Sequence, residues 1–211
     1  MIPTGSYREC AEAPPWPAQP QEAVIAGLLN LAADSSPDVA AHMERTARLA
    51  SAFVQDLELT EPLARTTVLT ARLHDIGKLG IPPWVLEKAG PLSEFEIHVM
   101  RSHSVVGQAM LERRPELAPL GPLVRATHER WDGSGYPDRL CGSAVPLPSR
   151  VVAVCDAFDA MTKPRVYSGS VSIAAALGEL DRCAGTQFDP GVVTVFRGLF
   201  ESRFDRLAKG A

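Results

Sequence analysis

The sequence predicts an all-α protein that folds as a compact helical bundle. Its 211 residues are 45% hydrophobic and 22% charged, a balance typical of a globular domain that buries a core without disulfide or zinc. Signals for helix starts recur along the chain, in which a capping residue or a proline precedes an apolar run. No segment has a convincing strand pattern, and no internal repeat is present.

The first 20 residues contain five prolines, which remove backbone donors and block helix propagation. They predict a flexible tail or the remnant of a linker over residues 1–20, followed by one domain over residues 21–211. The expected helices cover residues 21–31, 36–57, 61–77, 84–88, 93–113, 117–129, 149–161, 170–184 and the chain from 190 onward. Residues 131–148, with three glycines and three prolines, are expected to form turns.

The second and third helices have the clearest starts in the first half of the chain. Ser36 can cap a helix, Pro37 suits its first turn, and Asp38 favours the positive end of its dipole. Residues 61–62, Glu-Pro, open the next helix in the same way. Its apolar side is formed by Leu63, Val68, Leu69 and Leu73.

The later helices are also marked at their starts. Residues 82–83, two prolines, form a loop before a short helix. Ser93 and Glu96 have the spacing of a capping box, which predicts that a helix begins there. Ser149 is expected to cap an apolar helix, and Pro190 to begin the last one.

Charge and cysteine content exclude several classes of protein. The net charge is −4, from 21 basic and 25 acidic residues, which argues against binding of a nucleic acid polymer. The negative net charge is still compatible with a small anionic ligand, because bound divalent metals can make the local electrostatic potential positive. Four cysteines without a CxxC pair predict reduced thiols in the cytoplasm. We expect no signal peptide, because polar residues follow the first five positions, and no membrane span, because no run of 18 apolar residues occurs.

The dipeptide His74-Asp75 is the first candidate for chemistry. Side chains at consecutive positions diverge where a helix ends, so His74 could hold one metal ion while Asp75 bridges to a second. Lys78 follows one turn later and could pair with a phosphate oxygen. The alternative is an ordinary helix end, with Asp75 as a cap and Gly77 as a terminator.

Two carboxylates, Asp156 and Asp159, form the second candidate. They lie three residues apart in an apolar helix that we expect to be buried, where unpaired carboxylates are costly. A salt bridge from Arg150 or Arg165 would compensate for them, and so would a metal ion.

The remaining histidines differ in their surroundings. His42 shares a helix face with Asp38, which could ligate metal or simply favour the helix start. His103 and His128 lie near other polar groups, and imidazole together with carboxylate suits Fe, Mn, Zn and other first-row ions. His98 lies in the middle of an expected helix and is interpreted as a surface or packing residue.

Taken in order, these segments resemble the HD-GYP family of the HD phosphohydrolase superfamily. The similarity covers residues 22–205. The matching motifs are His42-Met-Glu-Arg45, His74-Asp75-Ile-Gly-Lys78, Arg101-Ser-His103-Ser-Val-Val-Gly107, His128-Glu-Arg-Trp-Asp-Gly-Ser-Gly-Tyr-Pro137, Asp156-Ala-Phe-Asp159 with Arg165 beyond it, and Gly185-Thr-Gln-Phe-Asp-Pro190. A lone His-Asp pair would carry no weight, whereas this ordered series is specific.

The resemblance implies a helical bundle of the HD/PDEase-like type with two or three divalent metal ions. Fe or Mn is expected, with Zn, Ni and Mg as further possibilities. The implied metal ligands are His74, Asp75, Asp156, His103 and His128, joined in three-metal members by His42, Asp159 and Asp38. In that subgroup a glutamate usually stands where this chain has Asp38.

The resemblance also implies an activity, the hydrolysis of cyclic di-GMP to pGpG or GMP. By motif, Asp75 and Lys78 would be catalytic, Lys78 and Arg165 would contact phosphate, and the loop with Gly135, Tyr136 and Pro137 would shape the substrate pocket. The alternatives are a related module that binds nucleotide or a protein partner without efficient catalysis, and a phosphohydrolase for another cyclic dinucleotide. A homodimer or a signalling protein partner is also expected.

Two positions depart from the family pattern. The family usually has two consecutive histidines before the loop, whereas this chain has Thr127 followed by His128. Threonine is at best a weak oxygen ligand, so the expected centre has lost one imidazole. Val166 stands where proline usually follows the arginine.

Overall fold

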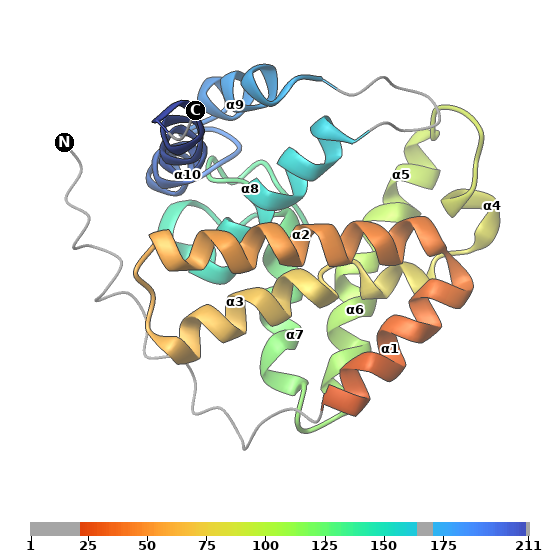
Figure 1. The fold of residues 1–211 in the computed structure, drawn as a ribbon. Helices are drawn as coiled ribbons and strands as arrows, with labels where there is room; N and C mark the ends of the chain where they lie inside the picture. Colours follow the sequence, from red (N-terminus) through yellow and green to blue (C-terminus); the bar gives the residue numbers. More distant parts are fainter. Residues whose placement is uncertain (1–21, 164–170, 210–211) are drawn as a thin grey trace.

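A computed structural model of the chain describes the backbone of residues 22–163 and 171–209 and shows a bundle of helices (Figure 1). The α-helices are α1 (Glu22–Ser35), α2 (Pro37–Asp56), α3 (Glu61–Leu73), α4 (Pro83–Leu86), α5 (Glu94–Arg101), α6 (His103–Glu112), α7 (Gly121–Arg125), α8 (Leu147–Thr162), α9 (Ile173–Arg182) and α10 (Pro190–Lys209). Short 3-10 turns are η2 (Ile76–Gly80), η3 (Ala118–Leu120), η4 (Ala126–His128) and η5 (Gly142–Ala144). Within these described ranges the only strand-like pairing is one isolated bridge, so the all-α prediction is confirmed.

The centre of the bundle is the pair α2 and α3, which lie side by side and both contact α8 (Figure 1). At one end of the pair, α1 packs on α2, and α6 packs on η2 and α7. At the other end, α9 and α10 pack on α8. The fold therefore brings the end of α3, the middle of α2 and the start of α6 close to α8.

Two apolar clusters fill the space between the helices. One contains Phe53 and Phe196, whose rings meet edge to face at 5.0 Å between centroids. The other contains Leu73 and Ile76, both fully buried. These two residues directly flank the dipeptide at positions 74–75, so its backbone is anchored on both sides by burial of apolar side chains.

The helix α3 ends earlier than expected, at Leu73, and the chain continues through η2. A Cβ atom at Gly77 would lie 1.9 Å from the carbonyl oxygen of His103 and 2.4 Å from the backbone nitrogen of Gly107. Glycine is needed there because η2 and α6 touch backbone to backbone. The alternative interpretation of Gly77 as a simple helix terminator is therefore incomplete.

Two long helices expected from the sequence are broken in the structure. The helix expected over 93–113 is interrupted at Ser102, whose hydroxyl donates to the carbonyl of Val99 at 2.6 Å and competes with the regular backbone bonds. The helix expected over 117–129 is divided into η3, α7 and η4. Pro122 within it has no backbone N–H to extend a regular ladder.

One predicted helix cap is wrong, and a second is confirmed in its position only. Ser149 lies inside α8, which begins at Leu147, and its hydroxyl donates to the carbonyl of Leu123 at 2.7 Å. That bond fastens α8 to the segment before it and leaves no capping role for this serine. Ser36 stands at the N-cap of α2, but its side chain makes no capping hydrogen bond.

Other helix starts are as predicted or close to it. The capping box is confirmed, because the backbone N–H of Glu96 donates to the Ser93 hydroxyl at 3.3 Å and the backbone N–H of Ser93 donates to the Glu96 carboxylate at 2.6 Å. Helix α9 is capped by Ser172, two residues after the expected start. Helix α1 continues to Ser35, beyond its expected end.

The predicted tail over residues 1–20 lies outside the described residues, and the division into tail and single domain stays a prediction. Among the described helices, none combines the length and the apolar character that a membrane crossing requires.

Substitution of Gly77 tests the contact between η2 and α6. We expect Gly77→Ala to lower the free energy of unfolding by about 3 kcal/mol, because the added methyl group collides with backbone atoms that cannot rotate away. The measurement is urea denaturation followed by circular dichroism. Gly178→Ala is the matched control: a Cβ there meets nothing within 4 Å on the exposed side of α9, so stability should rise by up to about 1 kcal/mol. Equal stability of the two variants would contradict the proposed contact.

Candidate metal centre

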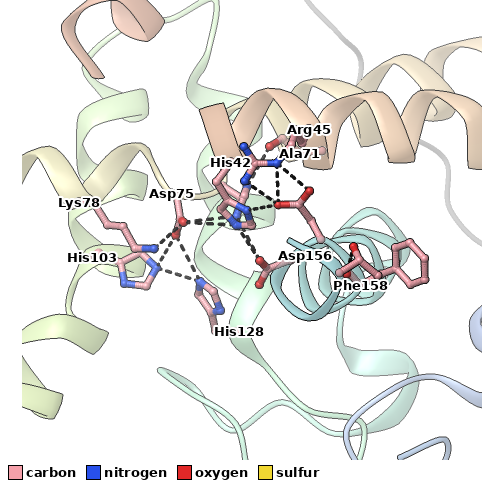
Figure 2. A network of polar contacts seen from close by, with 12 residues as sticks. His42, Arg45, Ala71, Asp75, Lys78, His103, His128, Asp156 and Phe158 are labelled. Carbon is pink, nitrogen blue, oxygen red and sulfur yellow. Dashed lines mark hydrogen bonds and ion pairs between the residues drawn. The ribbon is translucent and has the colours of Figure 1, made fainter. Parts of the chain in front are cut away.

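Polar side chains from five parts of the fold converge at the end of α3 (Figure 2). The middle of α2, the end of α3, the start of α6, η4 and α8 each contribute to the site. Six of these side chains form two groups of three. Within each group, the potential ligand atoms all lie within 4.8 Å of one another. The first group is His42, His74 and Asp156, and the second is Asp75, His103 and His128.

Within the first group, the Nε2 atom of His42 lies 2.8 Å from Oδ1 of Asp156. The Nε2 atom of His74 lies 3.9 Å from that same oxygen. His74 is fully buried, and Asp156 is a quarter exposed on the side of α8 that faces a cavity. Two imidazoles and a carboxylate therefore face one small volume.

The second group has a similar arrangement. The Nε2 atoms of His103 and His128 lie 2.8 Å apart, and Oδ1 of Asp75 lies 3.3 Å from the first and 3.8 Å from the second. The Nδ1–H of His103 donates to the carbonyl of Met100 at 2.7 Å, which leaves Nε2 as the atom directed at the site.

Asp75 joins the two groups. One of its oxygens, Oδ1, faces the second group, and the other, Oδ2, lies 3.5 Å from Nε2 of His74 and 3.9 Å from Nε2 of His42. The backbone explains this position, because α3 ends at Leu73 and Asp75 has φ −103° and ψ 7°, outside helical geometry. The ends of the side chains at 74 and 75 nevertheless lie only 3.5 Å apart, so they converge on one centre and do not diverge as the sequence predicted.

The residues fit divalent metal ions. Nε2 of His74 and Oδ1 of Asp75 are buried and have no hydrogen-bond partner among the described residues. The Nδ1–H of His74 donates to the carbonyl of Ala71 at 2.8 Å, so Nε2 carries the free lone pair. Such unpaired buried atoms are costly unless something else compensates for them, and a bound cation would do so.

Burial and neighbouring charges keep most of these ligands in their metal-binding forms. Burial lowers the pKa of His103 to about 4, with a further contribution from His128, and burial also lowers the pKa of His74. Burial opposes ionisation of Asp75, but the charges of Lys78 and His74 hold the pKa of that carboxyl well below its usual range. Neutral imidazoles and an ionised carboxylate are the states that bind metal.

His42 is the exception in the metal-free protein. Burial would lower the pKa of His42, but hydrogen bonds to Asp156 and Asp159 outweigh burial and raise that pKa to about 9. Burial also opposes ionisation of Asp156, whose bond to His42 lowers the pKa of its carboxyl to about 2. Ligation by His42 therefore requires loss of its proton.

Asp159 makes a different contact from the one expected. Its carboxylate accepts three bonds from the guanidinium of Arg45, from Nε at 2.9 and 3.1 Å and from Nη2 at 2.9 Å. Its Oδ2 also lies 2.8 Å from Nδ1 of His42. The prediction that Arg150 could be its partner is wrong, because Arg150 pairs with Asp189 at 2.6 Å. Asp159 thus orients His42 and lies outside the two ligand groups.

The predicted roles of Asp38 and Arg165 are not tested by the structure. Asp38 lies exposed in the first turn of α2 and belongs to neither ligand group of the described residues, so its role as a ligand stays a prediction. Arg165 and Val166 lie outside the described residues.

Lys78 is near the centre, with Nζ 2.5 Å from Oδ2 of Asp75. His98 is exposed, in agreement with its interpretation as a surface residue.

The loop that follows η4 covers one side of the centre. The ring of Tyr136 stacks on His128, with centroids 5.2 Å apart and planes 11° from parallel. Gly135 permits this position, because a Cβ there would lie 2.4 Å from the backbone nitrogen of Arg130 and 2.6 Å from Cα of Glu129. The peptide bond from Tyr136 to Pro137 is cis.

The loop is held in place from two directions. Glu129 is buried, and its carboxylate accepts a bond from the backbone N–H of Asp138 at 2.7 Å. On the other side, the backbone N–H of Trp131 donates to the carbonyl of Gln187 at 3.1 Å. Gln187 also accepts a side-chain bond from Arg130 at 2.8 Å. These bonds explain how the segment around 185–190 serves the site.

A cavity of about 240 Å³ opens beside His128 and Asp156. Its lining includes Tyr136 and two residues not predicted as site residues, Arg101 and Gln187. Both residues lie in segments that the motif comparison matched. The motifs assigned no role to either side chain, so their contact with the cavity was not predicted.

The family assignment follows from comparison with known proteins. The HD domain family matches residues 27–192, which is most of the chain. The chain belongs to the HD domain family. It is 41% identical over 155 residues to the cyclic di-GMP phosphodiesterase response regulator RpfG of Xanthomonas campestris, covering 72% of this chain and 41% of that protein. It is 36% identical over 157 residues to a cyclic di-GMP phosphodiesterase of Thermotoga maritima, covering 74% and 43%.

Members of the HD domain family with solved structures confirm the fold. The HD domain of the Listeria monocytogenes phosphodiesterase PgpH has a TM-score of 0.62 at 15% identity, covering 86% of this chain and 98% of that one. A cyclic GMP-AMP specific phosphodiesterase of Vibrio cholerae has a TM-score of 0.61 at 22% identity, covering 84% and 47%. The relatives named as cyclic di-GMP phosphodiesterases confirm the resemblance to the HD-GYP branch of the family.

Thr127 occupies the position where this branch usually has a second histidine. The side chain is buried, and its hydroxyl donates to the carbonyl of Val124 at 2.8 Å. Thr127 also lines the cavity beside His128. The hydroxyl hydrogen is therefore committed to the backbone, and the second ligand group has two imidazoles instead of three.

Two substitutions at this position test its part in metal binding. We expect Thr127→His to raise the metal retained per chain after dialysis against a chelator, because it adds an imidazole beside the second group. Thr127→Val keeps the shape and removes the hydroxyl, so metal content should stay unchanged. The measurement is elemental analysis of the dialysed proteins. Loss of metal from Thr127→Val would mean that the hydroxyl is itself a ligand.

Proposed function

We propose that this chain is a metal-dependent phosphodiesterase that hydrolyses cyclic di-GMP to pGpG, GMP or both. The observation that carries the proposal is the pair of ligand groups joined by Asp75, with buried donor atoms directed at the space between them. Two metal ions close together are a recurrent arrangement in enzymes that cleave phosphate esters.

The proposed cofactors are two or three divalent ions, with Fe or Mn as the expected metals. A mixed set of imidazole and carboxylate donors supports first-row transition metals over calcium or magnesium. The first ion would be held by His42, His74 and Asp156, and the second by His103 and His128, with Asp75 shared. A third ion would need Asp159 released from Arg45, together with Asp38.

The bound ions would supply Lewis acidity toward the phosphate and activate water at neutral pH. Asp75 holds both groups of ligands at fixed separation, because its carboxylate is buried and contacts each of them. The ammonium of Lys78 is 2.5 Å from Asp75 and can neutralise charge that develops on the phosphoryl oxygens. Tyr136 and the loop that carries it form the wall against which the substrate would lie.

The choice of substrate is supported by the names of the relatives. Proteins 34% to 41% identical to this chain are named as cyclic di-GMP phosphodiesterases. Others, including one from Vibrio cholerae that is 33% identical over 172 residues, are named as specific for 3'3'-cGAMP. The Listeria HD domain, similar in fold, has a solved complex with cyclic di-AMP. A cyclic dinucleotide is the common feature, and cyclic di-GMP fits the most similar of these proteins.

The chain spans less than half the length of the relatives named as cyclic di-GMP phosphodiesterases. It covers 41% of the protein from Xanthomonas campestris and 44% of one from Vibrio cholerae. We therefore treat the activity, the substrate and the partners of the whole protein as proposals. A homodimer or a signalling protein partner stays a prediction.

A second candidate function is a module that binds a cyclic dinucleotide or a protein partner without efficient catalysis. Thr127 favours it, because the second ligand group lacks one imidazole. Turnover decides between the two candidates. Protein with a full metal complement that binds cyclic di-GMP and does not cleave it would support the binding module.

Removal of the shared carboxylate is the sharpest test of the enzyme proposal. We expect Asp75→Ala to abolish turnover of cyclic di-GMP and tight metal binding together, because the second group loses its carboxylate and the first loses the neighbouring oxygen 3.5 Å from His74. Turnover is followed by chromatography of the nucleotides, and metal by elemental analysis. Asp34→Ala, a change of an exposed carboxylate on α1, is the control that should retain both. Unchanged metal content in Asp75→Ala would show that the site is assigned wrongly.

Lys78 should act on the reaction and leave metal binding intact. We expect Lys78→Ala to lower kcat by about 100-fold, since it removes a charge from the phosphate being cleaved. Metal content should stay close to that of the unmodified protein, because lysine is in neither ligand group. Lys88→Ala is the matched control, since Lys88 pairs with Glu96 on the surface. A variant at Lys78 with normal kcat would remove it from the mechanism.

A further inference from the structure

A second and larger cavity adjoins the metal centre. This groove has a volume of about 670 Å³ and is lined by residues of α5, α6 and the loop around Tyr136. It shares four lining residues with the cavity of about 240 Å³ beside the metal ligands. The shared residues are Arg101, Ser134, Gly135 and Tyr136. The combined volume lies in the range of pockets that hold nucleotide-sized ligands.

The groove is basic in a protein that is acidic overall. Its lining includes His98, Arg101 and Arg139 and contains no aspartate or glutamate, although the chain carries a net charge of −4. Neither arginine has an ion pair in the part of the chain that the structure describes. Among the carboxylates of the same loop, Asp138 pairs with Arg125, and Asp132 accepts a bond from the groove-lining Ser134 and lies 3.5 Å from Arg130. Among the described residues, no carboxylate therefore pairs with the arginines of the groove.

Arg101 connects the groove to the metal centre. Its guanidinium carbon lies 5.1 Å from the centroid of the Tyr136 ring, and that ring stacks on His128 at 5.2 Å. A cation over an aromatic face is attracted to it, which restricts the arginine without using its N–H donors. Those donors stay available to a ligand, at the boundary between the two cavities.

We propose that Arg101 is a substrate-binding residue that holds the phosphodiester group of a cyclic dinucleotide that is not being cleaved. This inference rests on the proposed function. A cyclic dinucleotide carries two phosphodiester groups, so when one lies at the metal centre the other needs a separate anion site. A guanidinium binds phosphate oxygens with two parallel hydrogen bonds, and Arg101, which has no ion pair in the described ranges, lines both cavities.

The test compares two substrates with different numbers of phosphates. Bis(p-nitrophenyl) phosphate has a single phosphodiester group, and cyclic di-GMP has two. We expect Arg101→Ala to raise KM for cyclic di-GMP by about tenfold or more, the loss expected for hydrogen bonds to a charged group, and to change kcat much less. Cleavage of bis(p-nitrophenyl) phosphate should stay within about twofold of the unmodified protein. Arg101→Lys should restore part of the affinity, since it keeps the charge without the fork of donors.

Arg113→Ala is the matched control. Arg113 is an exposed arginine at the end of α6 that lines neither of the two cavities, so its removal changes net charge alone. Its KM for cyclic di-GMP should equal that of the unmodified protein. A rise in KM as large as that of Arg101→Ala would overturn the proposal, because the effect would then be one of overall charge.

The identity of the contacted group is tested with cyclic di-AMP. Binding of each cyclic dinucleotide to metal-free protein is measured by calorimetry, where no turnover interferes. If Arg101 holds a phosphate, Arg101→Ala weakens both ligands by the same factor. A loss confined to cyclic di-GMP would mean that Arg101 contacts guanine, and the phosphate assignment would be overturned. Failure of the unmodified protein to bind either ligand would overturn it as well.

Different results would contradict the proposed function and the proposed role of Arg101. Metal-loaded protein that cleaves bis(p-nitrophenyl) phosphate but no cyclic dinucleotide would contradict the proposed function. Normal turnover of cyclic di-GMP by the unmodified protein together with an unchanged KM in Arg101→Ala would contradict the role of Arg101 alone.

Discussion

The buried carboxylate of Asp75 is the group on which the rest of the site depends. It is 2% exposed, it lies against Lys78 on one oxygen and within 3.3 Å of His103 on the other, and it joins the two groups of ligands. An ionised carboxylate in such a place needs compensation from several directions. Here that compensation comes from η2, α6 and the end of α3, so the charge at the centre and the packing of the helices stabilise one another.

The helices serve this centre by setting the backbone at a few positions. After the end of α3, Asp75 leaves helical geometry, and Gly77 then lets η2 touch α6. The break at Ser102 matters in the same way, because α6 begins at His103 and its imidazole enters the site from the first position of that helix. Interruptions of regular structure, more than the helices themselves, bring the ligands together.

Much of the site could be predicted from the sequence, because its members stand in motifs with fixed local spacing. The histidines and aspartates of the two groups were all predicted as ligands, and the all-α fold followed from helix starts and the lack of strand patterns. Helix lengths were less predictable. Ser149 has the residue type of a cap and instead bonds Leu123 from inside α8, a contact that depends on the packing of two helices.

The sequence by itself determined the fold class, the ligand types and the absence of a second histidine at Thr127, because these depend on local pattern and residue identity. Only the tertiary structure decided which distant groups meet. Asp159 pairs with Arg45, 114 positions earlier in the chain, and the expected partner Arg150 binds Asp189. Arg101 acquires its place over Tyr136 in the same manner. Local spacing carries information about periodicity and caps, whereas contacts between remote side chains depend on how whole helices pack.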